Sequence, residues 1–277
     1  MSNYMSHFTM QRPFCSITIL ELICVLFSIQ LFNAVSSPVI AQVNVFTSET
    51  MKQMQLQAGW YNSVKLDLAY SSGNTDLLTM RTRFRADHLS KSFHAFLFGS
   101  LQQGRKDDDL FTSKGIAHAR IIRNLTNHIL VESFVQKQFN ESILLTDRNL
   151  LGGGFRFAFS SPEAKVNFYF GTGIMWEHER INDIDKGAIV TRILRSTNYV
   201  SWKAELDDHI STSATGYYQV SLDEVKDYRI LFEGSISFSL SKRLTMPFSA
   251  NFRFDNSPPT GIRKHDLEIF NGLSYTF

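Results

Sequence analysis

Acidic residues stand directly beside histidines at four places in the chain, and such pairs are the first candidates for general acid–base chemistry. Neighbouring residues on a β-strand point to opposite faces, so none of these pairs can act as a dyad through its adjacent partner. His178 could still meet a residue from another strand or a loop, which leaves a rim-site hydrolase of lipid or peptide as an alternative. No serine after the N-terminal segment has a recognisable nucleophile setting, and we expect no enzyme. The pairs are Asp87-His88, Glu177-His178-Glu179, Asp208-His209 and His265-Asp266.

Two further motifs could hold a phosphate or a metal ion. Gly152-Gly153-Gly154 lacks the Lys-Ser/Thr and the following helix of a phosphate loop, so it predicts a strand where the backbone approaches a neighbour closely or bends. Asp183-x-Asp185-x-Gly187 lacks the bidentate acid expected at position twelve of a calcium loop. We therefore expect a solvated loop there, and neither a metal site nor a cofactor.

Charged residues alternate with apolar ones along the predicted strands. Arg81, Arg83 and Arg85 share one face of the segment Leu78 to His88 and need a polar environment. If the other face meets lipid, that environment is the inside of a barrel. The charges there either pair with one another and close the lumen, or they line a small pore with a mild preference for anions. Lys203, Glu205, Asp266 and Glu268 are further candidates for this face. The predicted lumen-lining residues are Arg81, Arg83, Arg85, Arg120, Glu132, Arg156, Arg229, Glu233 and Arg253.

The strand that positions the others is the last one, Leu267 to Phe277, which alternates and then ends at an aromatic residue. Its terminal residues Leu273, Tyr275 and Phe277 resemble the closing strand of bacterial outer-membrane β-barrels, which the barrel-assembly machinery recognises. An unpaired edge is too costly in lipid, so this strand should pair with the first one and close a barrel.

The same alternation recurs from Trp60 onward and predicts about twelve strands, an even number, in a transmembrane antiparallel up-and-down β-barrel. Connections alternate between long and short, as in Glu179 to Thr191 against Ser241 to Arg243, so both ends of the barrel chain should be periplasmic. A soluble β-sandwich is the alternative fold. A predicted aromatic belt comprises Trp60, Tyr70, Trp176, Tyr199, Trp202, Tyr217, Tyr218 and Tyr275.

The N-terminal segment reads as a cleavable signal peptide over residues 1–41. The apolar run Phe14 to Phe32 precedes the small-residue pattern Val39-Ile40-Ala41, although Glu21 inside the run leaves an uncleaved membrane anchor as an alternative. Residues 42–58 should form a periplasmic lead-in and residues 59–277 the barrel. Both cysteines, Cys15 and Cys24, lie in the signal, so no cysteine chemistry is expected afterwards. The net charge of +2 and the absence of a basic block exclude a nucleic-acid footprint.

Several motifs resemble a domain-of-unknown-function family of salt-induced outer-membrane β-barrel proteins. They are Trp60 with Ser63-Val64, the turn Ser72 to Asp76, Arg148 to Gly154, and Gly171 to Gly173 before Trp176-Glu177. The resemblance implies export to the bacterial cell outer membrane and a link to salt or osmotic stress, and no chemistry. We expect a monomer in outer-membrane lipids, either structural or a small-solute channel. Binding of a ligand or partner through the outer loops remains an alternative.

Overall fold

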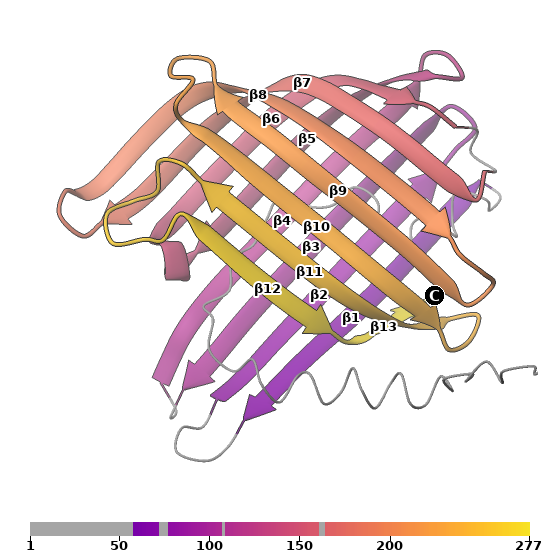
Figure 1. Ribbon diagram of the computed structural model, residues 1–277, viewed down its shortest axis with the longest axis horizontal. Helices are drawn as coiled ribbons and strands as arrows, with labels where there is room; N and C mark the ends of the chain where they lie inside the picture. The colour runs from indigo at the N-terminus through magenta and orange to yellow at the C-terminus, as the bar shows by residue number, and fades with distance from the viewer. Residues whose placement is uncertain (1–57, 72–76, 107–108, 161–163) are drawn as a thin grey trace, which may run out of the picture. The chain divides into compact units, whose positions relative to one another are not determined.

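Thirteen antiparallel β-strands make a single sheet that closes on itself (Figure 1). The computed structural model describes residues 58–71, 77–106, 109–160 and 164–277, which contain no helix long and apolar enough to cross a membrane. The expected signal peptide and nearly all of the expected lead-in lie outside the described residues. The strands are β1 (Gly59–Ser71), β2 (Leu77–Leu89), β3 (Phe93–Lys106), β4 (Asp109–Asn124), β5 (Ile129–Asn140), β6 (Leu145–Ala158), β7 (Val166–Asp183), β8 (Gly187–Glu205), β9 (Ile210–Ser221), β10 (Tyr228–Ser239), β11 (Leu244–Asp255), β12 (His265–Asn271) and β13 (Leu273–Thr276), with a 3₁₀ turn η2 (Glu141–Ile143) between β5 and β6.

Each strand pairs with its neighbours in chain order, and the order of the sheet runs without a crossover from β1 to β11. β12 and β13 are two parts of one strand, interrupted at Gly272, so the barrel has twelve strands. The predicted up-and-down barrel of about twelve strands is therefore confirmed. We call the end that holds Gly59 and Phe277 the proximal end, and the opposite end the distal end.

The last strand closes the barrel against the first. β13 pairs with β1 from Ser63↔Thr276 to Leu66↔Leu273, and the backbones of Asn62 and Phe277 exchange two hydrogen bonds of 3.0 and 3.2 Å. Gly272 lies where this strand passes closest to β1, because a Cβ there would overlap the Asp67 carboxylate and lie 2.8 Å from the Leu66 carbonyl oxygen. The C-terminal residue itself thus completes the seam.

The strands reach further at the distal end than the sequence pattern predicts. The expected long connection Glu179 to Thr191 is wrong, because β7 runs to Asp183 and β8 begins at Gly187. Beyond the apolar band, outward residues such as Arg180 and Arg192 are polar, so the alternation in hydrophobicity fades while the backbone ladder continues.

Deleting Phe277 should lower the fraction of assembled barrel, because Asn62 then loses both backbone partners at the seam. Phe277→Ala keeps those backbone bonds and removes only the ring. The folded fraction of each variant is measured by comparing the gel migration of unboiled and boiled samples. This is done for protein extracted from membranes and for protein refolded into detergent. If Phe277→Ala assembles normally in cells, Phe277 closes the barrel through its backbone and is no side-chain signal for the assembly machinery.

Candidate functional site

The two faces of the barrel differ in chemistry. Large apolar side chains point outward, such as Leu66, which is 43% exposed, and Ile174, which is 55% exposed. Charged side chains point inward and are buried, as Arg156 and Glu177 are. An apolar outside and a polar inside are what a barrel in lipid requires, since all its backbone groups are paired within the sheet. The protein is a transmembrane β-barrel of the outer-membrane type.

All nine residues predicted to line the lumen lie at inward positions of their strands. Arg83 and Glu233 are partly buried, and the other seven are at most 7% exposed. Seven of them lie in three clusters of ion pairs, together with residues that the sequence pattern did not single out. Arg85 instead pairs with Asp87 on its own strand, with Nε 2.8 Å from Oδ2.

The first cluster, which we call the Glu177 cluster, lies in the distal half of the barrel. Glu177 is fully buried and is bonded by three arginines from β6, β8 and β10. Arg195 Nε donates to Glu177 Oε1 at 2.9 Å, Arg229 Nη1 donates to Oε2 at 3.0 Å, and Arg148 also donates to Oε2. A carboxylate with three guanidinium partners is a strong hub, because charge-assisted bonds exceed neutral ones in strength.

Arg229 extends the Glu177 cluster across the barrel. Its guanidinium also contacts Glu179 Oε1 at 3.2 Å and Asp255 Oδ2 at 2.9 Å. Arg253 donates to the same Asp255 oxygen. Five strands, β6, β7, β8, β10 and β11, are tied together through the lumen by this cluster.

The second cluster joins the first strands to the last. Asp67 on β1 accepts from Arg81 Nε at 3.2 Å and from Arg83 Nη2 at 2.7 Å. Glu268 on β12 accepts from Lys114 Nζ on β4 and lies 3.9 Å from Arg81 Nη1. These pairs cross the seam region from inside.

The third cluster surrounds Glu132 on β5. Arg156 Nη2 donates to Glu132 Oε2 at 2.6 Å, and Arg120 Nη1 donates to Oε1 at 3.3 Å. The Tyr199 hydroxyl donates to Oε2 at 3.1 Å and accepts from Arg156 Nε at 2.5 Å. All polar atoms of this carboxylate thus have partners from other strands, as burial demands.

Tyr199 and Tyr217 correct the predicted aromatic belt. Both point into the barrel, where they are 4% and 2% exposed and lie with ring centroids 5.3 Å apart. The strand pattern around Tyr199 is irregular, so its face could not be read from the alternation. Trp60, Trp176, Trp202, Tyr218 and Tyr275 do lie on the outside.

Several interior partners escaped the sequence reading because the predicted strands were too short. Lys114 and Arg148 precede the predicted starts of their strands, and Asp255 follows the predicted end of its strand. Continuing the period of two past the apolar positions would have placed all three inside. The other buried charged residues that were not predicted are Lys65, Asp67, Asp87, Glu177, Glu179, Asp183 and Arg195.

The adjacent acid–histidine pairs do not form dyads. Asp87 points inward and contacts His94 Nε2 at 2.7 Å, whereas His88 lies outside against Trp60, with ring centroids 4.6 Å apart. His178 is paired in register with Arg192 and has its ring centroid 6.1 Å from that of Trp176 on the outside. Within the described ranges, no group of three or more metal-binding side chains is present.

The glycine run at β6 is required for close approach of two backbones. Gly154 is in register with Gly173, and a Cβ on Gly154 would overlap the Thr172 carbonyl oxygen and lie 2.6 Å from Gly173 Cα. A Cβ on Gly173 would overlap the Gly153 carbonyl oxygen in return. Even an alanine cannot fit at this contact without moving a strand.

Little space remains between the charged clusters. A cavity of about 10 Å³ lies between the Glu132 cluster and Gly153, and one of about 20 Å³ lies between the Glu177 cluster and Pro259. Each holds about one water molecule at most. At these two places the paired side chains of the described residues leave no room for a solute larger than water.

A distal loop covers the Glu177 cluster. Ile262, between β11 and β12, packs with Ile181 against Ile143 and Leu145. Thr260 N donates to Asp183 Oδ2 at 2.9 Å, and this bond, with those from two backbone N–H groups in the β7–β8 turn, lowers the pKa of Asp183. The carboxylate that anchors the loop is therefore ionised at neutral pH.

Comparison with known proteins identifies the family. A protein-family model described as "Protein of unknown function, DUF481" matches residues 64–277. The chain belongs to this family. The resemblance predicted from the sequence is thus confirmed. In this DUF481 member the Arg148 to Gly154 and Gly171 to Glu177 segments pair with each other and contribute Arg148 and Glu177 to the Glu177 cluster.

Solved structures similar to this DUF481 barrel include two porins and the translocator domain of an autotransporter. The NanC porin shares 7% identity over 78% of this chain and 98% of that chain, with a TM-score of 0.49. The translocator domain of the autotransporter NalP from Neisseria meningitidis shares 9% over 83% and 94%, with a TM-score of 0.43, and the KdgM porin shares 8% over 79% and 99%, with a TM-score of 0.40. At this similarity they say nothing of what the chain does. None of the curated proteins matches the chain.

Proposed function

We propose that this protein is a monomeric barrel of the bacterial outer membrane, exported through a cleavable signal peptide, whose role is structural or the restricted passage of small solutes. It acts without a cofactor and is not an enzyme. Lipids of that membrane surround it, and the barrel-assembly machinery inserts it. The link to salt or osmotic stress that the family resemblance implies is part of the same proposal.

One observation carries this proposal: the interior is filled by paired charges, and the cavities left are of the size of single waters. Three clusters bridge strands on different sides of the lumen, so the barrel is braced from within. Breaking such pairs is costly because each would leave a buried charge without its partner. We therefore do not expect a wide, permanently open pore.

Any ions that do pass meet a basic surface. Among the described residues, the buried charged side chains comprise eleven lysines and arginines against eight aspartates and glutamates. Side chains that line a narrow path set its selectivity. The excess of positive charge favours chloride over potassium.

Reconstituted in a planar bilayer, the protein should show small and infrequent conductance steps with mild chloride preference. Arg83→Gln should reduce that preference, because Arg83 is the partly exposed interior arginine, with 20% of its side chain accessible. Arg123→Gln is the matched control, since Arg123 is exposed outside the lumen at the proximal end of β4. Reversal potentials in a potassium chloride gradient measure both variants.

Large, steady conductance would contradict the sealed lumen. Absence of any chloride preference in the steps that do occur would contradict the proposed role of the interior arginines.

A further inference from the structure

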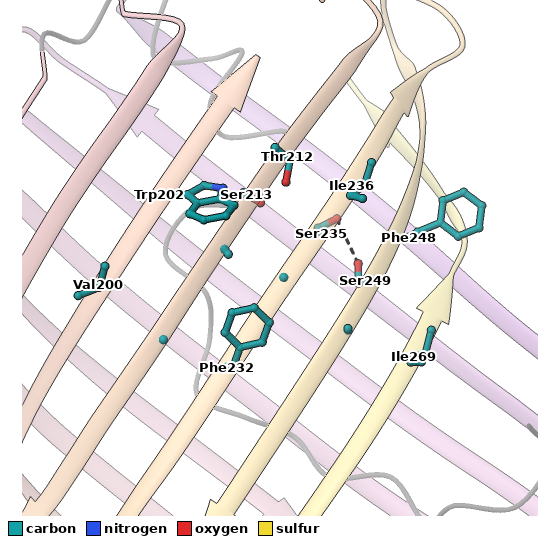
Figure 2. Close-up of a pocket in the computed structure, with 14 residues that line it drawn as sticks. Val200, Trp202, Thr212, Ser213, Phe232, Ser235, Ile236, Phe248, Ser249 and Ile269 are labelled. Atoms are coloured by element: carbon teal, nitrogen blue, oxygen red, sulfur yellow. Dashed lines mark hydrogen bonds between the residues drawn. The ribbon is translucent and has the colours of Figure 1, made fainter. Parts of the chain in front are cut away.

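The outer face of the barrel has a hollow between β8 and β12. A groove of about 530 Å³ lies there, within the size range of ligand pockets. Figure 2 shows that its labelled side chains come from neighbouring strands, with Trp202, Phe232 and Phe248 standing at its sides. Its floor consists of small outward residues, which are Ala214, Gly216, Gly234 and Ala250. We call this hollow the outer groove.

The outer groove lies in the half of the apolar band nearest the proximal end. Phe248 is four residues from the first residue of β11, and Ile236 is three residues from the last residue of β10. Phe248 lies five residues after Arg243. At a rise of about 3.3 Å per residue on a strand tilted about 40° from the membrane normal, Phe248 lies about 12 Å deeper in the membrane than Arg243. This depth falls within one leaflet of a bilayer whose core is about 30 Å thick.

A basic pair stands at the membrane surface below the outer groove. Lys242 and Arg243 form the turn between β10 and β11, the two strands that carry Phe232, Ile236 and Phe248, and both side chains are exposed. Basic residues at a membrane surface attract lipid phosphates. The turn on the other side of β9 carries Asp207 and Asp208, so a phosphate is expected on the β10–β11 side.

We propose that the outer groove holds one acyl chain of a glycerophospholipid whose phosphate is bound by Lys242 and Arg243. Lipid tails are as apolar as the groove, so the specificity comes from shape and from the phosphate, and not from the hydrophobic effect. The small residues of the floor let a chain lie closer to the barrel than it lies elsewhere on the apolar band, and each added contact contributes dispersion energy. The proposal does not depend on whether the lumen conducts.

Gly216 offers a substitution that fills the outer groove without disturbing the barrel. A Cβ at Gly216 meets no heavy atom within 4 Å, so Gly216→Leu places its side chain in the space of the acyl chain. Gly99→Leu is the matched control, because Gly99 also points outward, on β3, and a Cβ there would meet only the Ile116 carbonyl oxygen at 4.0 Å. Heat-modifiable migration establishes that each variant is folded.

The test is native mass spectrometry of the full protein purified in detergent with added palmitoyl-oleoyl phosphatidylglycerol. The wild type should retain one phospholipid, Gly99→Leu should retain it equally, and Gly216→Leu should retain about tenfold less. Lys242→Gln/Arg243→Gln should lower retention of the phospholipid on the order of tenfold while retention of palmitoyl-oleoyl glycerol, which has no charged headgroup, stays unchanged.

Equal retention by Gly216→Leu and the wild type would overturn the proposal, and so would an equal loss in Gly99→Leu. A dimer without retained lipid would also overturn it, since a second copy would then occupy the groove. Quenching of Trp202 by a phospholipid brominated on its acyl chain, in a Trp60→Phe/Trp176→Phe background, provides a second measurement, and Gly216→Leu should weaken it.

Discussion

Glu177→Gln should destabilise the barrel by about 3–5 kcal/mol, among the largest effects of any interior substitution that leaves the backbone intact. Glutamine has nearly the same shape, so packing changes little. It removes the negative charge that Arg148, Arg195 and Arg229 share, and these guanidinium groups are at most 7% exposed. The three cations would then keep only Glu179, Asp227 and Asp255, at the edges of the cluster, as counter-charges. Unfolding in urea, followed by tryptophan fluorescence in detergent, measures the change.

Glu205→Gln is the matched control for this result. Glu205 pairs with Lys203 at 2.8 Å, but 22% of its side chain is exposed, so water screens this pair. Its loss should cost at most about 1 kcal/mol, as for pairs near water. Equal losses in the two variants would show that the Glu177 cluster has no special role in bracing the barrel.

Gly154→Val should prevent stable pairing of β6 with β7, with a loss of more than about 3 kcal/mol. The added Cβ overlaps the Thr172 carbonyl oxygen, which belongs to the backbone and cannot rotate away. The strands would have to separate where Gly154 is in register with Gly173, beside the Glu132 cluster. The fraction that migrates as folded barrel before boiling, and its midpoint in urea, both report the effect.

Gly99→Val is the control for this prediction, because it places a valine in a strand without a clash against a neighbouring backbone. Valine favours strands, and a Cβ at Gly99 lies 4.0 Å from its nearest neighbour, so this variant should be as stable as the wild type or slightly more stable. If Gly154→Val folded as well as Gly99→Val, the close approach of β6 and β7 would not be a requirement of the fold.

Together the three charged clusters explain how a barrel of this size can be rigid with so few buried apolar side chains. The buried side chains of greatest volume include Arg156, Arg195 and Lys114. Their pairs span β1 to β12 and connect strands that share no ladder, such as β4 and β12 through Lys114 and Glu268. The inside of the barrel is thus a packed polar core.

Much of this architecture could be predicted from the sequence because a period of two is a local property. The alternation of Leu267 to Phe277 indicated a strand with one apolar face, and its repetition indicated about twelve such strands. Closure followed from the cost of an open edge in lipid. The inward positions of Arg81, Arg85 and Arg120 follow from the same parity.

The tertiary structure decided everything that depends on which strands face one another. Glu132 and Tyr199 are 67 residues apart and Lys114 and Glu268 are 154 apart, and no local pattern couples them. Tyr199 points inward from a stretch whose alternation is irregular. The strands also continue past the apolar band, where hydrophobicity no longer indicates which residues belong to a strand. The sequence alone determined the barrel and its two faces, because each residue's face is set by its neighbours. Whether the lumen is open or sealed was decided only by closure, which brings side chains from distant strands within hydrogen-bonding reach.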